Sequence, residues 1–360
     1  MSAPFDELPR DVVCKRSRCA RLKSYVSFGG AMATLLILGD LQASDLSISK
    51  PIQHFGATDG SAAIACGGPY FVGATDENNV LRLYSVDEGS IGRALLDLNP
   101  LLGIKPKMKD GKEKFDECDL EGAARIGDRI YWIGSHGANS EGKPKKERQV
   151  LFATKVIGSG EGTKLEMTGT PYRNLLTDLV ADHELDDFKL GEAAKNAPKE
   201  EGGLNIESLC AVGQTLYIGF RNPIPNGKAL IVPLVNPSAV VDEGKPAEFG
   251  KPILLELGGL GLRDMAWWHD KLLLIGGDFR DRFDPKAQPS RLFLWKNCGG
   301  DVADLKIDFG DLNPEALVVF EDGRLLILSD DGARKVGDLT NKDLEESKQS
   351  FRSVWVQGGQ

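Results

Sequence analysis

The sequence lacks the residue patterns that mark zinc sites and elbow-type serine nucleophiles. Its 360 residues include only four histidines, and no two of them have the spacing of a zinc-ligand pair. None of the six cysteines belongs to a Cys-x-x-Cys pair, and the Gly-x-Ser-x-Gly elbow of serine hydrolases is missing. These absences disfavour zinc sites, dithiol redox chemistry and an elbow-type serine nucleophile.

Basic residues are also fewer than acidic residues. The chain has 44 Lys and Arg against 53 Asp and Glu, so its formal net charge is −9. Nucleic-acid backbones are bound by basic faces, and this balance therefore predicts no nucleic-acid partner. Part of the acidic excess could instead bind cations.

No hydrophobic run is long enough to span a membrane comfortably. The longest, residues 26–39, is shorter than the ~20 residues that a spanning helix needs. It follows a basic stretch and precedes small residues near Ser44, which is the pattern of a secretory signal. We therefore expect residues 1–43 to be a signal peptide, with an uncleaved membrane anchor as the alternative. The mature chain, 44–360, is expected to be periplasmic or secreted and to have no membrane span.

The cysteines left after cleavage are even in number. They are Cys66, Cys118, Cys210 and Cys298, for which three pairings exist. Cys66 and Cys210 stand in apolar segments, so buried thiols are at least as good an interpretation as disulfides.

Short strands recur along the chain after one repeated acidic position. Ten residues after each of Glu121, Glu207, Asp264 and Glu315 an apolar strand begins, and a fifth copy has Gly60 at the acidic position. Four of the five units have a further apolar strand, at 80–87, 149–156, 229–235 and 291–297. The intervals suit four-stranded propeller blades with insertions. The sequence predicts an all-β fold, a β-propeller of five to six blades.

Two segments refine this prediction. Residues 175–197 have helical apolar spacing, which predicts a helix or helix pair inserted in the longest repeat. That repeat, between Glu121 and Glu207, could alternatively contain the sixth blade. Near the carboxyl end, SVWVQ could close the ring by pairing with LSISK at the start of the mature chain.

The repeated acids are candidate metal ligands. Equivalent residues of propeller blades face one axis, so Glu121, Glu207, Asp264 and Glu315 are expected to converge. Calcium accepts six to eight oxygen ligands, which carboxylates, carbonyls and water can supply. We therefore predict a Ca²⁺ site. The alternative is that each acid caps a turn within its own blade.

Polar residues follow each of these strands and are expected at the rim of the same channel. Among them, His136 could act as a general base, and Arg221 could hold an anionic small molecule such as a phosphate or carboxylate. A lone histidine beside a glycine-rich turn is also commonly a structural hydrogen-bonding group. Ser135 and His136 are adjacent on a strand end, where neighbouring side chains point in different directions.

Several sequence blocks resemble a family of bacterial proteins of unknown function. They are DLEGAARIGDRIYWIGSHG, GGLNIESLCAVGQTLYIGFRNP, LGGLGLRDMAWW and LNPEALVVFEDGRLLILSDDG. More distantly, the Asp-x-Glu-Gly block at 119–122 is similar to one in esterase-like phytase propellers, and the layout is similar to calcium-dependent lactonase propellers. These resemblances imply a metal ion on the propeller axis, but they do not assign catalytic residues to this sequence.

Two function classes follow from these observations. The first is a metal-dependent hydrolase of phosphoesters or lactones, in which a cation polarises the bond to be hydrolysed and His136 transfers the proton as a general base. The second is a noncatalytic propeller that binds a ligand or a protein. Propellers host both classes, so the fold alone leaves the enzymatic status and the oligomeric state open.

Overall fold

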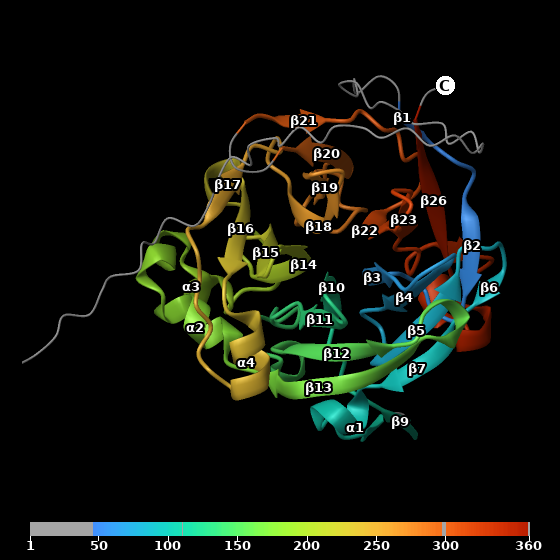
Figure 1. Ribbon diagram of the computed structural model, residues 1–360, viewed down its shortest axis with the longest axis horizontal. Helices are drawn as coiled ribbons and strands as arrows, with labels where there is room; N and C mark the ends of the chain where they lie inside the picture. The colour runs from blue at the N-terminus through green and yellow to red at the C-terminus, as the bar shows by residue number, and fades with distance from the viewer. Residues whose placement is uncertain (1–45, 110, 297–299, 359–360) are drawn as a thin grey trace, which may run out of the picture.

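Four four-stranded sheets and one six-stranded sheet surround a central axis in the computed structural model, which describes residues 46–109, 111–296 and 300–358 (Figure 1). Within each blade, the four strands that define it pair antiparallel. The first strand of each blade lies nearest the axis (Figure 1). The prediction of an all-β propeller is confirmed, with five blades.

The blades are contiguous in sequence except for the last. Blade 1 contains β3 (Ala62–Ala65), β4 (Tyr70–Ala74), β5 (Val80–Ser85) and β7 (Arg93–Asp97). Blade 2 contains β10 (Leu120–Ile126), β11 (Arg129–Gly134), β12 (Leu151–Ile157) and β13 (Lys164–Tyr172). Blade 3 contains β14 (Asn205–Val212), β15 (Thr215–Asn222), β16 (Ala229–Leu234) and β17 (Ile253–Leu255). Blade 4 contains β18 (Gly261–Trp268), β19 (Lys271–Gly277), β20 (Arg291–Trp295) and β21 (Val302–Asp304).

Blade 5 combines strands from both ends of the chain. It contains β22 (Pro314–Val319), β23 (Leu325–Ser329), β26 (Ser350–Gly358) and β2 (Ile52–Phe55), while β1 (Leu46–Ile48) also pairs with β26. In that pairing Leu46 lies opposite Gly358 and Ile48 opposite Val356. The predicted pairing of the two chain ends is confirmed.

The second strands of the blades are apolar runs because both of their faces are covered. In β11, β15 and β19 every residue after the first is buried. Five hydrophobic clusters result, one between each pair of neighbouring blades around the ring. Each blade therefore depends on two neighbours for its core.

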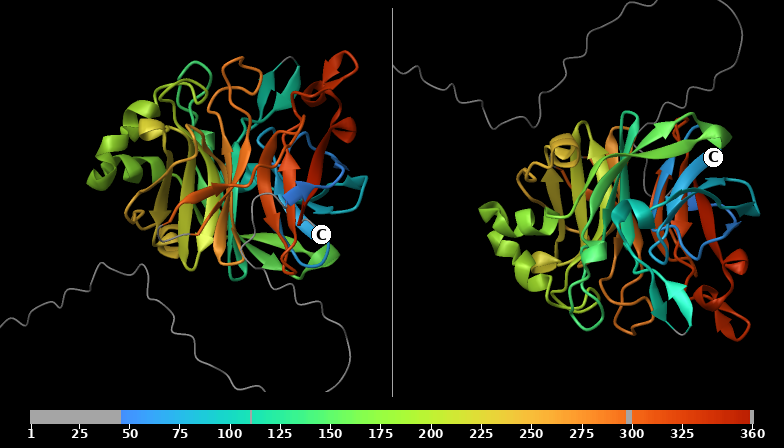
Figure 2. Two further views of the ribbon diagram at one scale, coloured as in Figure 1. Left: turned by 90° about the horizontal axis from the view of Figure 1, so that it is seen from above. Right: turned by 90° about the horizontal axis from the view of Figure 1, so that it is seen from below.

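The segment 175–197 is helical, as its apolar spacing predicts. It forms α2 (Leu175–Ala181), the 3₁₀ segment His183–Phe188 and α3 (Leu190–Ala193) at one edge of the ring (Figure 2). Leu175, Leu179 and Leu190 pack into the core between blades 2 and 3. Between Glu121 and Glu207 the chain forms these helices and the strands that complete blade 2, so the alternative of a sixth blade there is wrong.

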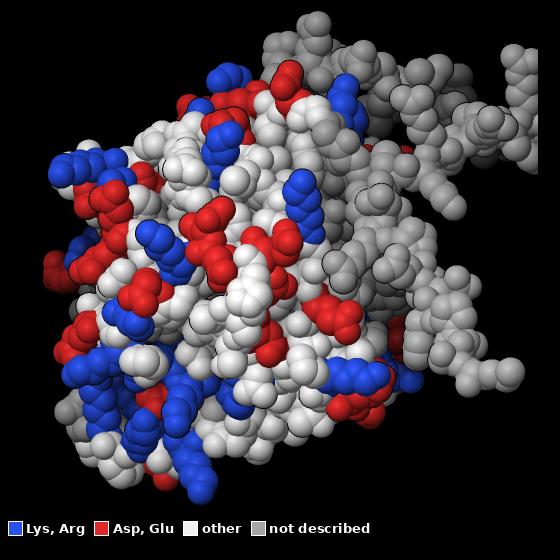
Figure 3. Space-filling model, turned by 90° about the vertical axis from the view of Figure 1, so that its left-hand side faces the viewer, with Lys and Arg blue, Asp and Glu red and all other residues white. Residues whose placement is uncertain are grey.

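Shorter elements lie in the connections between strands and between blades. They are β6 (Ser90–Ile91), α1 (Asn99–Leu102), β8 (Lys107–Lys109), β9 (Lys112–Lys114), α4 (Pro237–Glu243), β24 (Lys335–Val336), β25 (Leu339–Thr340) and the 3₁₀ segments Lys146–Arg148, Gly160–Gly162, Pro225–Gly227, Asn341–Asp343 and Glu346–Lys348. On the face that carries α2 and α3, acidic and basic side chains are interspersed, with a group of Lys and Arg at the lower left of the view (Figure 3).

Some sequence predictions fall outside the described residues. The signal segment 1–43 and Cys298 are among them. Cys66, Cys118 and Cys210 are buried free thiols. Across the part of the chain that the structure describes, no helix is both long and apolar enough to span a bilayer.

Candidate functional site

A β-bulge marks the axial end of the first strand in four blades. In blade 2, Leu120 pairs with Gly134 but Gly122 pairs with Ile133, so the pairing passes over Glu121. Equivalent shifts pass over Glu207, Arg263 and Glu315 in the following blades. A bulge turns one extra residue out of the ladder, and here it does so at the same place in each blade. The repeated position is therefore occupied by three glutamates and one arginine.

Asp264 lies one residue beyond this position, where Gly122 stands in blade 2. Successive strand residues point to opposite faces, so a shift of one residue changes the side chain's surroundings. The Asp264 carboxylate accepts a hydrogen bond from the Leu317 backbone N–H of blade 5 at 2.7 Å, and burial raises its pKa well above the usual range. It is not among the described residues that line the central cavity. This geometry favours a role between blades rather than the predicted ligand role.

A cavity of about 710 Å³ opens at this end of the channel and is called the channel cavity below. Glu121, Glu207 and Glu315 line it together, as the repeat predicts, and Arg221 is also in its wall. Its other charged lining residues are Asp76, Glu77, Glu117, Asp119, Arg148, Lys199, Glu200, Arg263, Asp330 and Lys342. The lining is more acidic than basic, and it contains oxygen ligands but no histidine or cysteine among the described residues.

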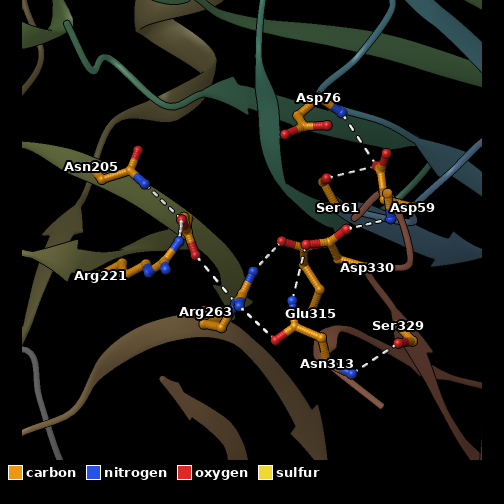
Figure 4. Close-up of polar contacts among 12 residues, drawn as sticks. Asp59, Ser61, Asp76, Asn205, Arg221, Arg263, Asn313, Glu315, Ser329 and Asp330 are labelled. Atoms are coloured by element: carbon orange, nitrogen blue, oxygen red, sulfur yellow. Dashed lines mark hydrogen bonds and ion pairs between the residues drawn. The ribbon is translucent and has the colours of Figure 1, made fainter. Parts of the chain in front are cut away.

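Arginines neutralise one side of this cavity. Arg263 forms an ion pair with Glu315 through Nη2, and its Nε lies 3.5 Å from Glu207 Oε2. Its Nη1 also donates to Asn313 Oδ1 at 3.1 Å (Figure 4). Burial raises the pKa of Glu315 to about 8, although Arg263 opposes that rise. Arg263 thus places an internal cation at the position where the sequence predicts a fourth acid.

Arg221 completes this neutralised side. Its Nη1 donates to Glu207 Oε1 at 2.6 Å, and Asn205 Nδ2 donates to the same oxygen at 2.6 Å (Figure 4). Arg221 Nε and Nη2 donate to the backbone carbonyls of Asp278 and Arg280, each at 2.7 Å. Three donor atoms are therefore engaged, and the side chain fastens blade 3 to the loop after β19.

Other acids of the cavity have far less compensation. One carboxylate oxygen from each of Asp76, Asp119 and Glu121 lies within 4.8 Å of the others, and we call these three residues the acid cluster. Glu121 is 7% exposed, and its carboxylate has no hydrogen-bond or ion-pair partner among the described residues. Asp119 receives a hydrogen bond from Ser135 and an ion pair from Arg148 at 3.0 Å.

The electrostatics of the acid cluster follow from this packing. Burial raises the pKa values of Asp76 and Glu121 well above the usual carboxylate range, and repulsion from neighbouring acids raises them further. The pKa of Asp119 is raised by burial, while Arg148 and Ser135 oppose the change. Carboxylates held this close favour either protons or a shared cation.

Blade 1 contributes an acid that the repeat alignment missed. Asp59 precedes Gly60 and accepts hydrogen bonds from the hydroxyls of Thr58, Ser61 and Thr75 at 2.7–2.9 Å. The Asp76 backbone N–H also points to Asp59, at 3.4 Å (Figure 4). Asp59 is therefore a hydrogen-bond acceptor that orients the start of the Asp76 loop. The sequence signal for Asp76 is its place among the polar residues that follow the blade 1 strand β4.

His136 lies away from the channel cavity lining. It is 1% exposed, and its backbone has a φ of 55°, in the left-handed region. Nδ1 donates to the Gly134 carbonyl at 2.8 Å, which leaves the buried Nε2 without a hydrogen-bond partner among the described residues. Burial lowers the pKa of His136 to about 4. This setting is that of a neutral structural imidazole, and the predicted general-base role gains no support from it.

Together the fold and the cavity define a five-bladed β-propeller with an acidic, partly arginine-neutralised channel mouth. Residues 153–303 match the family model described as "Protein of unknown function (DUF3616)". The resemblance to an uncharacterised family that the sequence blocks indicate is thereby confirmed. No protein of curated function matches the chain.

Solved structures of other propellers are similar at low sequence identity. A putative oxidoreductase (glucose dehydrogenase) from Thermus thermophilus is 14% identical, with a TM-score of 0.43, over 87% of this chain and 100% of that chain. A gluconolactonase from Xanthomonas campestris is 13% identical, with a TM-score of 0.36, over 84% of this chain and 78% of its own. The WD40 propeller domain of Doa1 is 10% identical, with a TM-score of 0.35, over 86% of this chain and 96% of that chain. These similarities assign no activity to this chain.

Proposed function

We propose that this protein is a calcium-dependent hydrolase of phosphoesters or lactones, with the cation held by the acid cluster of Asp76, Asp119 and Glu121. The observation that carries the proposal is the contrast between the two sides of the channel cavity. Arg263 and Arg221 compensate Glu207 and Glu315, whereas the buried Glu121 carboxylate has no hydrogen-bond or ion-pair partner among the described residues. A cation would remove the repulsion in the cluster.

Calcium suits these residues better than zinc or copper. The cluster offers carboxylate oxygens alone, and calcium completes its six to eight ligands with carbonyls and water. The channel cavity leaves room for such waters and for a small substrate. When bound, a divalent cation polarises a phosphoryl or carbonyl oxygen and lowers the pKa of a coordinated water. The phosphoester class retains the anionic substrate expected from the sequence, although Arg221 and Arg263 in the same wall are already paired with Glu207 and Glu315.

The proposal includes export to the periplasm or the medium. It is supported by the basic stretch and the apolar run 26–39 at the amino terminus, which lie outside the described residues. Amino-terminal sequencing of the protein from a periplasmic fraction would give a start near Ser44. A start at Met1 would contradict a cleaved signal.

The metal site is tested with Glu121→Gln, and Glu315→Gln is the matched control. Both replace a bulged axial glutamate, but only Glu315 is paired with Arg263. We expect Glu121→Gln to weaken calcium binding about 100-fold or more, and Glu315→Gln to retain it within about tenfold. Titration calorimetry on metal-stripped protein measures both. At 100 times its Kd, calcium should stabilise the wild type by about 2.7 kcal/mol.

The control also distinguishes the two ligand sets. Equal loss in Glu121→Gln and Glu315→Gln would favour the ring of acids predicted from the repeat. No calcium binding by the wild type would refute the metal, and with it the hydrolase mechanism.

The second candidate function is a noncatalytic ligand-binding or protein-binding propeller. It is favoured by the absence of histidine from the described lining of the channel cavity and by the burial of His136 outside that lining. Assays on aryl esters, lactones and phosphomonoesters with calcium discriminate the two. Turnover that disappears in Glu121→Gln supports the hydrolase; calcium binding without turnover on any substrate supports the binding protein.

A further inference from the structure

A second cavity adjoins the channel cavity and has a different charge character. It has a volume of about 390 Å³ and lies between the loop after β19 and the segment before β22. Arg221 and Arg263 line both cavities. Its remaining arginines are Arg280, Arg282 and Arg291, and its acidic lining residues are Asp278 and Asp308. We call this space the arginine cleft.

The two buried arginines of the cleft have their carboxylate partners elsewhere. Glu207 and Glu315, which pair with Arg221 and Arg263, line the channel cavity but not the arginine cleft. The cleft is thus bordered by guanidinium groups whose counter-charges lie toward the neighbouring cavity. Guanidinium groups bind carboxylates and phosphates with directed pairs of N–H donors.

The acids that do line the cleft are already engaged. Asp278 accepts hydrogen bonds from Arg280 Nη1 at 3.0 and 3.2 Å, and from the backbone N–H groups of Arg280 and Gln288 at 2.9 and 3.0 Å. Its role is to fix the loop that carries Arg280. Asp308 is exposed and accepts from the Gly310 backbone N–H at 2.8 Å.

Positive charge in the cleft exceeds what nearby acids neutralise. Arg282 forms no ion pair with a described residue; its Nη2 donates to the Asp311 carbonyl at 3.1 Å, and its guanidinium lies over the Phe283 ring. Arg291 shares the Asp304 carboxylate with Lys306, at 3.2 and 2.8 Å. One carboxylate thus serves two cations, and the Asp311 carboxylate, which interacts with Arg282 at longer range, is already paired with Arg352 at 2.8 Å.

We propose that the arginine cleft binds an oxyanion, a phosphate or carboxylate group, through Arg280, Arg282 and Arg291. Arg280 and Arg291 are about one-third exposed, so each has donors that a ligand can reach. Ser290 adds a hydroxyl to the same wall. The site requires neither the calcium ion nor the hydrolytic activity proposed above. It places an anion-binding site next to the channel cavity, separated from it by Arg221 and Arg263.

Titration calorimetry with inorganic phosphate tests this inference. Metal-stripped mature protein is used in a chloride buffer of fixed ionic strength without chelator, since a polycarboxylate chelator would compete for the same groups. We expect saturable binding that weakens about tenfold in Arg282→Gln, the loss of one charge-assisted contact. The matched control is Arg324→Gln, an exposed arginine paired with Asp322 outside the cleft, which should bind as the wild type does.

A parallel titration with succinate identifies the class of ligand. Binding of phosphate but not succinate assigns the cleft to phosphorylated ligands, and the reverse assigns it to carboxylates. Absence of saturable binding by either anion overturns the inference, as does equal affinity in Arg282→Gln and Arg324→Gln. Because no metal is present, these outcomes are independent of the calcium test.

Discussion

Arg263 is the residue that divides the channel mouth into two unlike sides. It replaces an acid at the bulged position and pairs with Glu315 on one side and Glu207 on the other. All three side chains are at least nine-tenths buried. Removing one member of such a network leaves buried charge without compensation, which costs more than the network contributes when intact.

The first prediction at this scale concerns Arg263→Gln. It should lower the free energy of unfolding by about 3–5 kcal/mol, because Glu207 and Glu315 lose a shared cation. Urea denaturation at neutral pH measures the change. Adding Glu315→Gln should recover part of the loss, and a double variant no more stable than Arg263→Gln would contradict the pairing.

The second residue-scale prediction concerns pH. Burial lowers the pKa of His136 from 6.5 to about 4, so the unfolded chain binds a proton there before the folded chain does. Its contribution to stability is therefore present above pH 6.5 and is lost as the pH falls toward 4. Between pH 7 and pH 5 this loss amounts to about 2 kcal/mol. The variant His136→Asn, which tolerates the left-handed backbone, should lose less stability over that interval than the wild type.

The loss of stability due to His136 is measured as the difference between the wild type and His136→Asn, because other titrating groups change the stability in the opposite direction. Carboxylates with raised pKa values, such as Asp264 and Glu315, favour the folded state as the pH falls. Denaturation of both proteins at pH 7 and pH 5 therefore isolates His136. An identical change in wild type and variant would show that the imidazole titrates normally in the folded protein.

At the scale of elements, the first strand of blade 4, β18, approaches the second strand of blade 3, β15, closely at Gly261. A Cβ on Gly261 would lie 2.0 Å from the Arg221 carbonyl oxygen, which is backbone and has little freedom to move. We predict that Gly261→Ala destabilises the protein by about 3 kcal/mol or more. Gly162→Ala is the control, because a Cβ there meets nothing within 4 Å, and it should stay within about 0.5 kcal/mol of the wild type. Thermal or urea unfolding compares the two; equal stability would refute the close approach of blades 3 and 4.

The same elements explain where sequence reasoning succeeded and where it failed. Turn residues and apolar runs located the second strand of every blade and the third strand of blades 1 to 4, and the helical spacing located α2 and α3. The outer strands β7, β13, β17 and β21 were not predicted. Asp264 was assigned to the repeated position in place of Arg263 because β19 contains three successive leucines, Leu272 to Leu274. In such a run the sequence does not show which leucine corresponds to the strand start in the other repeats. The bulge at Arg263 is a feature of the pairing between β18 and β19, and the spacing of residues along a single strand does not reveal that pairing. Asp76 comes from a loop outside the repeat, so its approach to Glu121 required the fold.

At the scale of the whole molecule, stability is distributed around the ring. Every hydrophobic cluster lies between two blades, so each blade buries its two faces against different neighbours. The axial sites likewise draw residues from several blades: the acid cluster from blades 1 and 2, and the Arg263 network from blades 3, 4 and 5. A binding event at the channel mouth therefore acts on the relative position of blades rather than on one sheet.

Blade 5 is completed by β2 from one end of the chain and β26 from the other. A growing polypeptide lacks β26 until blades 1 to 4 have been made, and its β2 has no antiparallel partner before then. Closure of the ring therefore follows the synthesis of the other four blades. Until closure the strand edges of blade 5 stay open to other chains, and that interval is the period in which a chaperone would protect this protein most.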